Sequence, residues 1–208
     1  MPRQNRVTPF GELIATNARG MFMGNRGVLH DSDGQLTSKR WTHPHWIICR
    51  LEFKGRKRTL MSPGCYTELF FTDEAVALAA GHRPCAECRR EDFNRFKAAW
   101  IEGNSHLGFS SKTSIGEIDR VLQMERVNRS HRKITYQDRL GNLPDGTFFT
   151  ALGSPGIFIC IWQGALWRWT PESYAEFGSL GADVMVEVLT PASTVNAMKA
   201  GFVPVVSV

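Results

Sequence analysis

The spacing of apolar residues predicts four helices along the chain. Phe93, Phe96 and Trp100 recur at intervals of three and four residues, which is typical of an amphipathic helix that buries one face. Ser114 and Glu117 form the capping-box pattern before a second amphipathic segment. Capping residues and terminal glycines mark two more helices, so the expected helical segments are 72–81, 91–101, 114–125 and 190–201.

Short alternating segments predict β-strands on both sides of these helices. Residues 46–53 alternate between apolar and polar and run into a basic turn, which predicts a hairpin that returns through 58–61. Later in the chain, turn-forming Pro-Asp-Gly, Pro-Gly and Gln-Gly steps separate short apolar runs. Strands are therefore expected near residues 147–151, 157–162, 165–169 and 184–189.

The order of these elements predicts an α+β fold in two parts. Residues 1–105 are expected to form a small zinc-stabilised module with short helices and a hairpin. The polar, Ser- and Gly-rich stretch 103–113 is the best candidate for a boundary. Residues 106–208 are then expected to contain one helix followed by a β-rich unit of barrel-like or curled-sheet type.

Composition limits the class of protein to which the chain belongs. With 42% hydrophobic residues among 208, it has enough apolar surface for one sizeable core or two small ones. There is no run of about 18 apolar residues, so no membrane span is expected. Residues 1–6 lack the apolar stretch of a signal peptide, which favours a cytoplasmic location. The sequence carries no signal for an oligomeric state.

The mild basic charge suggests a polyanionic partner. The net charge is +5, with a pI near 9.1, and the positive residues are clustered, including a stretch at 126–133. Basic clusters also occur at solvated hairpin tips and helix ends, so this alternative stays open. The residues expected to contact the phosphates of a nucleic acid are Lys54, Arg56, Lys57, Arg58, Arg89 and Arg90.

The most specific chemical feature is the Cys85-x-x-Cys88 turn before a helix. Two cysteines at this spacing form half of a structural zinc site, and Cys49 and Cys65 are the candidates for the other half. His45 and His82 are the substitutes if Cys49 or Cys65 is only a core residue. Cys160 lies in an apolar run and fits a core position. Five cysteines, an odd number, argue against a disulfide framework.

Residues 63–90 resemble the zinc-binding domain of the Ada family of DNA alkylation-repair proteins. The similarity consists of Pro63-Gly64-Cys65, an aromatic strand end at Phe70 and Phe71, an Ala-rich helix, Gly81-His82-Arg83-Pro84 and the Cys-x-x-Cys turn. The resemblance implies a Zn²⁺ held by Cys65, Cys85, Cys88 and a fourth ligand, on a scaffold that meets DNA. In Ada one zinc-bound cysteine accepts a methyl group, but the first two ligands there lie closer together than Cys49 and Cys65 do.

The sequence therefore predicts a zinc protein that binds nucleic acid, most simply DNA, through a basic surface organised by a structural metal. A metal-dependent nuclease is the main alternative, because His30, Asp31 and Asp33 lie together in a polar turn. A cysteine that accepts alkyl groups in DNA repair is a further alternative. A third is an interaction module with an exposed tryptophan face made of Trp162, Trp167 and Trp169, which also fit a β core.

Overall fold

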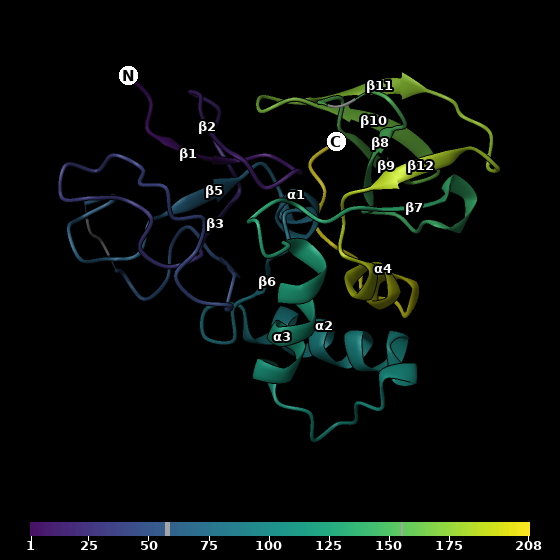
Figure 1. The fold of residues 1–208 in the computed structure, drawn as a ribbon, viewed down its shortest axis with the longest axis horizontal. Coiled ribbons are helices and arrows are strands. Elements are labelled where there is room, and N and C mark those ends of the chain that lie inside the picture. The colour runs from purple at the N-terminus through teal and green to yellow at the C-terminus, as the bar shows by residue number, and fades with distance from the viewer. Residues whose placement is uncertain (57–58, 155) are drawn as a thin grey trace.

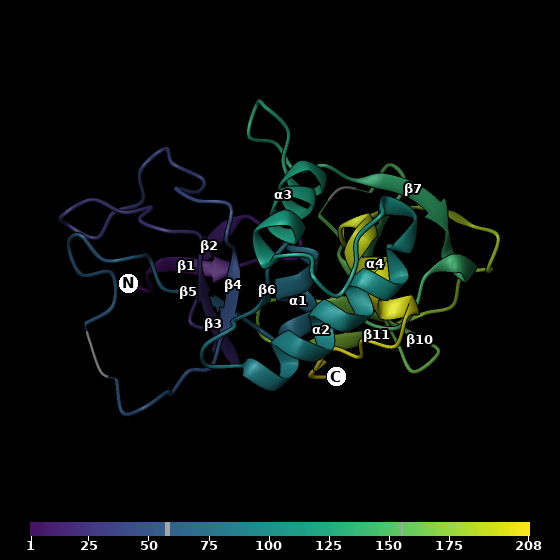
Figure 2. The same ribbon diagram turned by 90° about the horizontal axis from the view of Figure 1, so that it is seen from below.

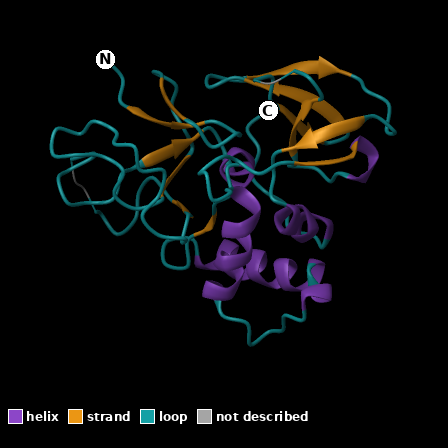
Figure 3. Ribbon diagram, in the orientation of Figure 1, coloured by secondary structure: helices purple, strands orange, loops and turns teal. Residues whose placement is uncertain are grey.

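In the part of the chain that the structure describes, two six-stranded sheets and four α-helices make up the fold (Figure 1). The structure is a computed structural model that describes residues 1–56, 59–154 and 156–208. Figure 3 shows the strands in two groups, with the helices gathered between them and to one side. The helices are α1 (Glu74–Ala79), α2 (Arg90–Gly103), α3 (Ile115–Arg126) and α4 (Ala192–Lys199), with 3-10 turns at Ser105–Leu107 and Leu140–Asn142.

The first sheet is mixed and has the strand order β2-β1-β5-β3-β4-β6. The pairs β1–β5 and β4–β6 are parallel, and the other neighbours are antiparallel. The long connections before and after β4 place two irregular segments beside this sheet. Its strands are β1 (Gln4–Val7), β2 (Leu13–Ala15), β3 (Phe22–Asn25), β4 (Ile47–Cys49), β5 (Leu69–Phe71) and β6 (Arg83–Pro84).

The second sheet is fully antiparallel, with the order β11-β10-β9-β8-β12-β7. Among the described residues β11 and β7 are its edges and do not pair with each other, so the sheet is open. Its strands are β7 (Tyr136–Arg139), β8 (Phe148–Ala151), β9 (Ile159–Trp162), β10 (Ala165–Trp169), β11 (Tyr174–Gly178) and β12 (Met185–Val188).

Helix α1 lies at the centre of the molecule, between the two sheets (Figure 2). Every residue of this short helix is buried, because its alanine, valine and leucine side chains pack in the core and Glu74 pairs with the buried Arg89. Asp73 caps the helix by accepting the backbone N–H of Val76. The same carboxylate accepts the Tyr174 hydroxyl from β11 and the Ser207 backbone N–H from the C-terminal segment. One cap thus connects three distant parts of the chain.

The predicted architecture is wrong on two points. The expected zinc-stabilised N-terminal module with its own helices is not evident, because one core cluster includes side chains from both halves, such as Phe71, Trp100, Phe148 and Trp169. The expected barrel is not formed, because the second sheet stays open in the described part of the chain. The boundary near residue 105 stays a prediction.

Several local predictions are confirmed. The capping box of Ser114 and Glu117 begins α3, and helices α1, α2 and α4 lie within or close to their expected ranges, although Asp73 rather than Thr72 caps α1.

The expected hairpin is wrong, because β4 pairs with β3 on one side and β6 on the other instead of with the segment that follows it. Within the described residues, no helix is both long and apolar enough to cross a membrane.

Candidate metal centre

The parallel pairing of β4 with β6 brings Cys49 beside Cys85. Ile47 pairs with Arg83 and Ile48 pairs with Pro84, so the next residue of each strand continues this register. The backbone N–H of Cys85 donates to the carbonyl oxygen of Ile48 at 2.9 Å, which fixes the two strand ends together. The sheet therefore places two sulfur atoms at the same edge.

Cys88 reaches the same point because the chain turns directly after Cys85. The backbone N–H of Arg89 donates to the carbonyl oxygen of Cys85 at 3.2 Å, and α2 begins at the next residue. Within the turn, the backbone N–H of Glu87 donates to the Cys85 sulfur at 3.4 Å. Backbone donors and the positive end of a helix both favour negative charge on sulfur.

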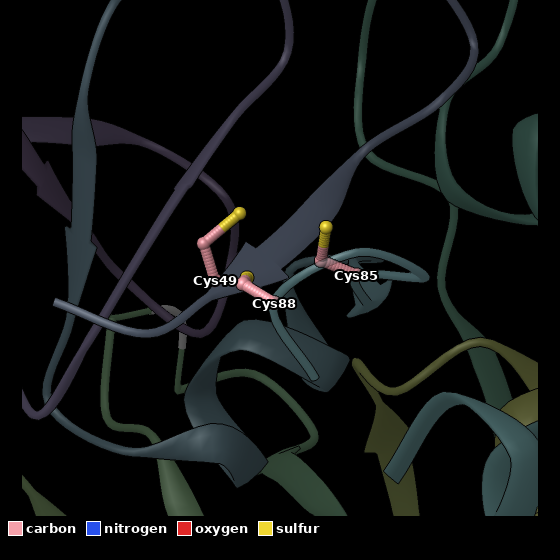
Figure 4. A group of neighbouring side chains, drawn as sticks. All are labelled: Cys49, Cys85 and Cys88. Carbon is pink, nitrogen blue, oxygen red and sulfur yellow. The ribbon is translucent and has the colours of Figure 1, made fainter. Parts of the chain in front are cut away.

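Cys49, Cys85 and Cys88 form a compact group whose sulfur atoms all lie within 4.8 Å of one another. Figure 4 shows the three side chains converging from the end of β4 and from the turn before α2. All three are free thiols and only 8–9% exposed. In a tetrahedral site with Zn–S bonds of about 2.3 Å, sulfur atoms are about 3.8 Å apart. The group therefore fits a metal ion with little rearrangement.

The three thiols influence one another strongly. The pKa of Cys85 is lowered, first because Cys49 donates a hydrogen bond to its sulfur and next because Cys88 does. The pKa of Cys49 is raised, since its proton is held in the bond to Cys85 and its thiol is buried. A divalent cation bound between the sulfur atoms would favour deprotonation of all three thiols.

A cavity of about 490 Å³ lies directly beside the sulfur atoms. Its apolar walls include Met23 and Phe53, while its polar lining includes Arg50, Tyr66 and Glu68. The position of these polar residues depends on how loops meet across the first sheet, and no spacing in the sequence marks them. Three protein ligands next to open space leave room for a fourth ligand.

The comparisons with known proteins give no relative. The chain matches no protein-family model, and no curated protein or solved structure is significantly similar to it. The metal centre is therefore interpreted from its own residues. Within the part of the chain that the structure describes, no second group of three His, Cys, Asp or Glu side chains comes as close together.

The other predicted ligands lie outside this group. Cys65 is partly buried in a turn closed by its backbone N–H and the carbonyl oxygen of Ser62. His45 contacts Asp119, with 2.6 Å between Nδ1 and Oδ2. His82 is fully buried, where Nε2 accepts from Arg26 at 3.2 Å. Cys160 is buried in the core, as the sequence predicts.

The predicted phosphate-binding residues divide into three kinds. Lys54, Arg56 and Arg90 are exposed, and Arg56 forms an ion pair with Glu87 at 2.6 Å. Arg89 is only 3% exposed, because its guanidinium pairs with Glu74 and Asp92, each at 2.8 Å. The charge of Arg89 is therefore paired in the interior, and this side chain does not contact a ligand at the surface. Lys57 and Arg58 lie outside the described residues.

The candidate nuclease residues have structural contacts. His30 is buried, with Nδ1 2.6 Å from the Thr67 hydroxyl and Nε2 3.2 Å from the Ser62 carbonyl oxygen. Asp31 accepts the backbone N–H groups of Asp33 and Gln35, as in an ordinary Asx turn. These hydrogen bonds explain why the polar residues lie together in the turn, and they require no metal.

Proposed function

We propose that this chain is a zinc-binding protein that uses its metal centre to organise a nucleic-acid-binding surface. The observation that carries the proposal is the group of three buried, unoxidised thiols whose sulfur atoms lie within 4.8 Å. Deprotonation of buried thiols is costly without a positive charge beside them, and a bound divalent cation supplies that charge. A thiolate-rich tetrahedral site favours zinc among the common divalent metals.

Cys65 is the proposed fourth ligand. It directly precedes Tyr66, which lines the cavity beside the three sulfur atoms. Gly64, with φ of +74°, gives the turn before Cys65 a conformation that most residues resist. A closed shell of four thiolates is the usual form of a structural zinc site. The resemblance of residues 63–90 to the Ada zinc-binding domain supports the same ligand set and stays part of the proposal.

The proposed nucleic-acid surface surrounds this centre. Arg50 directly follows Cys49, and Arg90 begins α2 two residues after Cys88, so the metal would fix both residues relative to each other. Lys54 and Arg56 are exposed on the loop that follows β4. Such cations bind the phosphate backbone with an affinity that falls with salt and depends little on sequence. DNA is the proposed partner, and RNA is the comparison.

The test is fluorescence anisotropy of the zinc-loaded protein with labelled duplex DNA, single-stranded DNA and RNA over a range of salt concentrations. Replacement of both Lys54 and Arg56 by Gln is expected to flatten the slope of log K against log salt by roughly 0.9 for each phosphate that is no longer neutralised. A matched control removes the exposed charges of Lys112 and Arg120 in the same way. Equal slopes for both double variants, or no binding to any nucleic acid, would contradict the proposed surface.

The cavity beside the sulfur atoms favours one second candidate, an alkyl acceptor. In this reaction a thiolate attacks the methyl carbon of a phosphate methyl ester, an S–C bond forms, and the C–O bond breaks with its electron pair on the leaving phosphodiester. The test is the intact mass of the zinc-loaded protein after incubation with DNA that carries methylphosphotriesters. A gain of one methyl group on Cys49, Cys65, Cys85 or Cys88 supports this candidate, and an unchanged mass excludes it.

The proposal places the protein in a reducing compartment, most simply the cytoplasm. Free thiols that must bind a metal persist where glutathione and thioredoxin keep cysteine reduced. All five cysteines are free. A fluorescent fusion localised outside the cytoplasm would contradict this part of the proposal.

A further inference from the structure

A second cavity, distinct from the thiol site, has five Lys and Arg side chains in its lining. It has a volume of about 320 Å³ and shares no lining residue with the cavity beside the cysteines. It lies where the segment after β1, the segment before β4 and the segment after α3 meet. Its charged lining residues are Arg26, Arg40, Arg126, Arg132 and Lys133, against a single acid, Glu12.

Three of these cations are buried or partly buried, and among the described residues none lies within ion-pair distance of a carboxylate, although Asp119 acts on Arg126 from farther away. Arg26 and Arg126 are 3% and 0% exposed, and Lys133 is partly buried. Arg26 donates to the carbonyl oxygen of Gly11, Arg126 to that of Gly81, and the Lys133 ammonium to that of Ala79. Among the described residues none of the three forms an ion pair with an acid. Neutral carbonyl groups satisfy hydrogen bonds but leave most of the positive charge uncompensated.

Two buried donors at this cavity also lack acceptors. Within the described part of the chain, Nη2 of Arg26 and Nε1 of Trp46 have no hydrogen-bond partner. Nε of Arg26 already donates to His82 Nε2, which places the His82 proton on Nδ1, beside the Ala77 carbonyl oxygen. Burial, and then the charges of Arg26 and Arg126, lower the pKa of His82, so this ring is neutral. The site therefore has spare donors and spare positive charge, the complement of an oxyanion.

Aromatic rings form another part of the wall. Trp46 contacts two guanidinium groups, with Arg126 Cζ 3.9 Å and Arg26 Cζ 4.2 Å from its ring centre. Trp41 is only half-buried and packs edge-on against His131, with 4.6 Å between ring centres. The cavity volume lies at the lower end of the range for small-molecule sites, about 300–1,000 Å³, and is larger than a phosphate ion alone would fill.

We propose that this cavity binds an organic phosphate of nucleotide size. Arg26 and Lys133 would contact the phosphate oxygens, Arg126 would add positive charge from behind, and Trp41 with His131 would contact the flat organic part. The same chemistry is offered by a free nucleoside monophosphate and by the 5′-phosphorylated end of a nucleic acid. The two cavities have no lining residue in common, so we expect binding here to persist when the metal is absent.

The test is isothermal titration calorimetry, with tryptophan fluorescence as a second readout, using AMP, inorganic phosphate, adenosine and a 5′-phosphorylated oligonucleotide. AMP is expected to bind more tightly than phosphate, and adenosine to bind weakly or not at all. If the oligonucleotide binds more tightly than AMP and its unphosphorylated form does not, the source is a nucleic-acid end; the reverse order indicates a free nucleotide.

Two variants locate the binding. Arg26→Gln and Lys133→Met are each expected to weaken AMP binding about tenfold or more, because each removes a charge-assisted hydrogen bond. Lys112→Gln, at an exposed position away from the cavity, is the charge-matched control. Circular dichroism checks that each variant is folded, and Arg40→Gln at the exposed rim provides a variant that leaves the interior intact.

Binding should also take up a proton. Burial, and then the charges of Arg26 and Arg126, lower the pKa of Lys133 to about 7. A bound dianion would raise it again, so AMP affinity is expected to fall between pH 7 and 9, where the phosphate charge is constant. This pH dependence should be absent in Lys133→Met. The other titratable or charged groups around the cavity are Glu12, Arg40, His131 and Arg132, with His82 and Asp119 behind.

The proposal is overturned if neither AMP nor phosphate binds at 1 mM, on the order of the weakest useful affinities. It is also overturned if Arg26→Gln and Lys133→Met bind AMP as the unchanged protein does. The variant Cys88→Ser separates this proposal from the zinc proposal. AMP binding that survives in Cys88→Ser supports an independent site even if the metal centre is refuted.

Discussion

Asp119 of α3 receives both arms of the Arg83 guanidinium, with Nε and Nη2 each 2.7 Å from a carboxylate oxygen. Both side chains are buried, and Arg83 lies two residues before Cys85. The pair therefore connects the strand that positions the Cys-x-x-Cys turn to a helix from later in the chain. Its geometry is bidentate, which fixes orientation as well as distance.

Removing one partner of this pair should be costly. Asp119→Ala leaves a buried guanidinium without its counter-charge, and the free energy of unfolding is expected to fall by about 3–5 kcal/mol. Chemical denaturation followed by tryptophan fluorescence measures the change. Asp183→Ala, which removes the exposed partner of Arg139, is the matched control and should have little effect. Similar losses in the two variants would contradict the structural role of Asp119.

Gly81 directly follows the C-cap of α1 and lies close to the side chain of Arg126. Its φ is +91°, and a Cβ atom there would lie 2.7 Å from Cδ and 2.9 Å from Cβ of Arg126. Gly81→Ala combines a left-handed backbone cost of about 1–2 kcal/mol with a steric clash of about 1–3 kcal/mol.

The variant Gly64→Ala measures the backbone cost alone, without the steric clash. Gly64 also has a positive φ, +74°, but no described atom lies within 4 Å of the place that an added Cβ would occupy. Thermal unfolding of the two variants should therefore show a larger decrease in stability for Gly81→Ala. Equal decreases would mean that Arg126 moves away without cost, against the packing described for the cationic cavity.

Lys133 should give the ligand-free protein an unusual dependence on pH. Its folded pKa of about 7 lies below the ordinary value of 10.5, so between these values the unfolded chain binds more protons than the folded one. Stability is then expected to rise as pH increases from about 7 towards 10, because the folded state no longer holds this charge in its interior. Zinc-loaded protein and its Lys133→Met variant are compared by urea denaturation. A parallel pH dependence in the two proteins would rule out this contribution.

Local sequence patterns predict those parts of the site that are close together along the chain. The spacing of Cys85 and Cys88 is enough to place both sulfur atoms on one turn, and the Ser114–Glu117 pair is enough to start α3. The position of Cys49 is different. Its residue type makes it a candidate ligand, but what brings it to the site is the parallel pairing of β4 with β6, which no local pattern specifies.

The predictions that failed also depend on contacts between residues that are far apart along the chain. The basic turn after residue 53 favours a hairpin locally, yet β4 pairs with β3 and β6 because they bury its apolar residues. The sequence around Arg89 indicates an exposed cation, but Glu74, from another helix, pairs with it in the interior. The cationic cavity brings Arg26 and Trp46 beside the basic stretch 126–133, and only the folded chain makes that arrangement visible.

The three thiols of the metal centre can be tested by native mass spectrometry of the purified protein. We expect one zinc ion per chain, falling well below one per chain in Cys49→Ser, Cys85→Ser and Cys88→Ser. Cys160→Ser, which changes a cysteine outside the group, should keep its zinc. Absence of zinc from the unchanged protein, or full retention of zinc in Cys88→Ser, would contradict a zinc centre built on these cysteines.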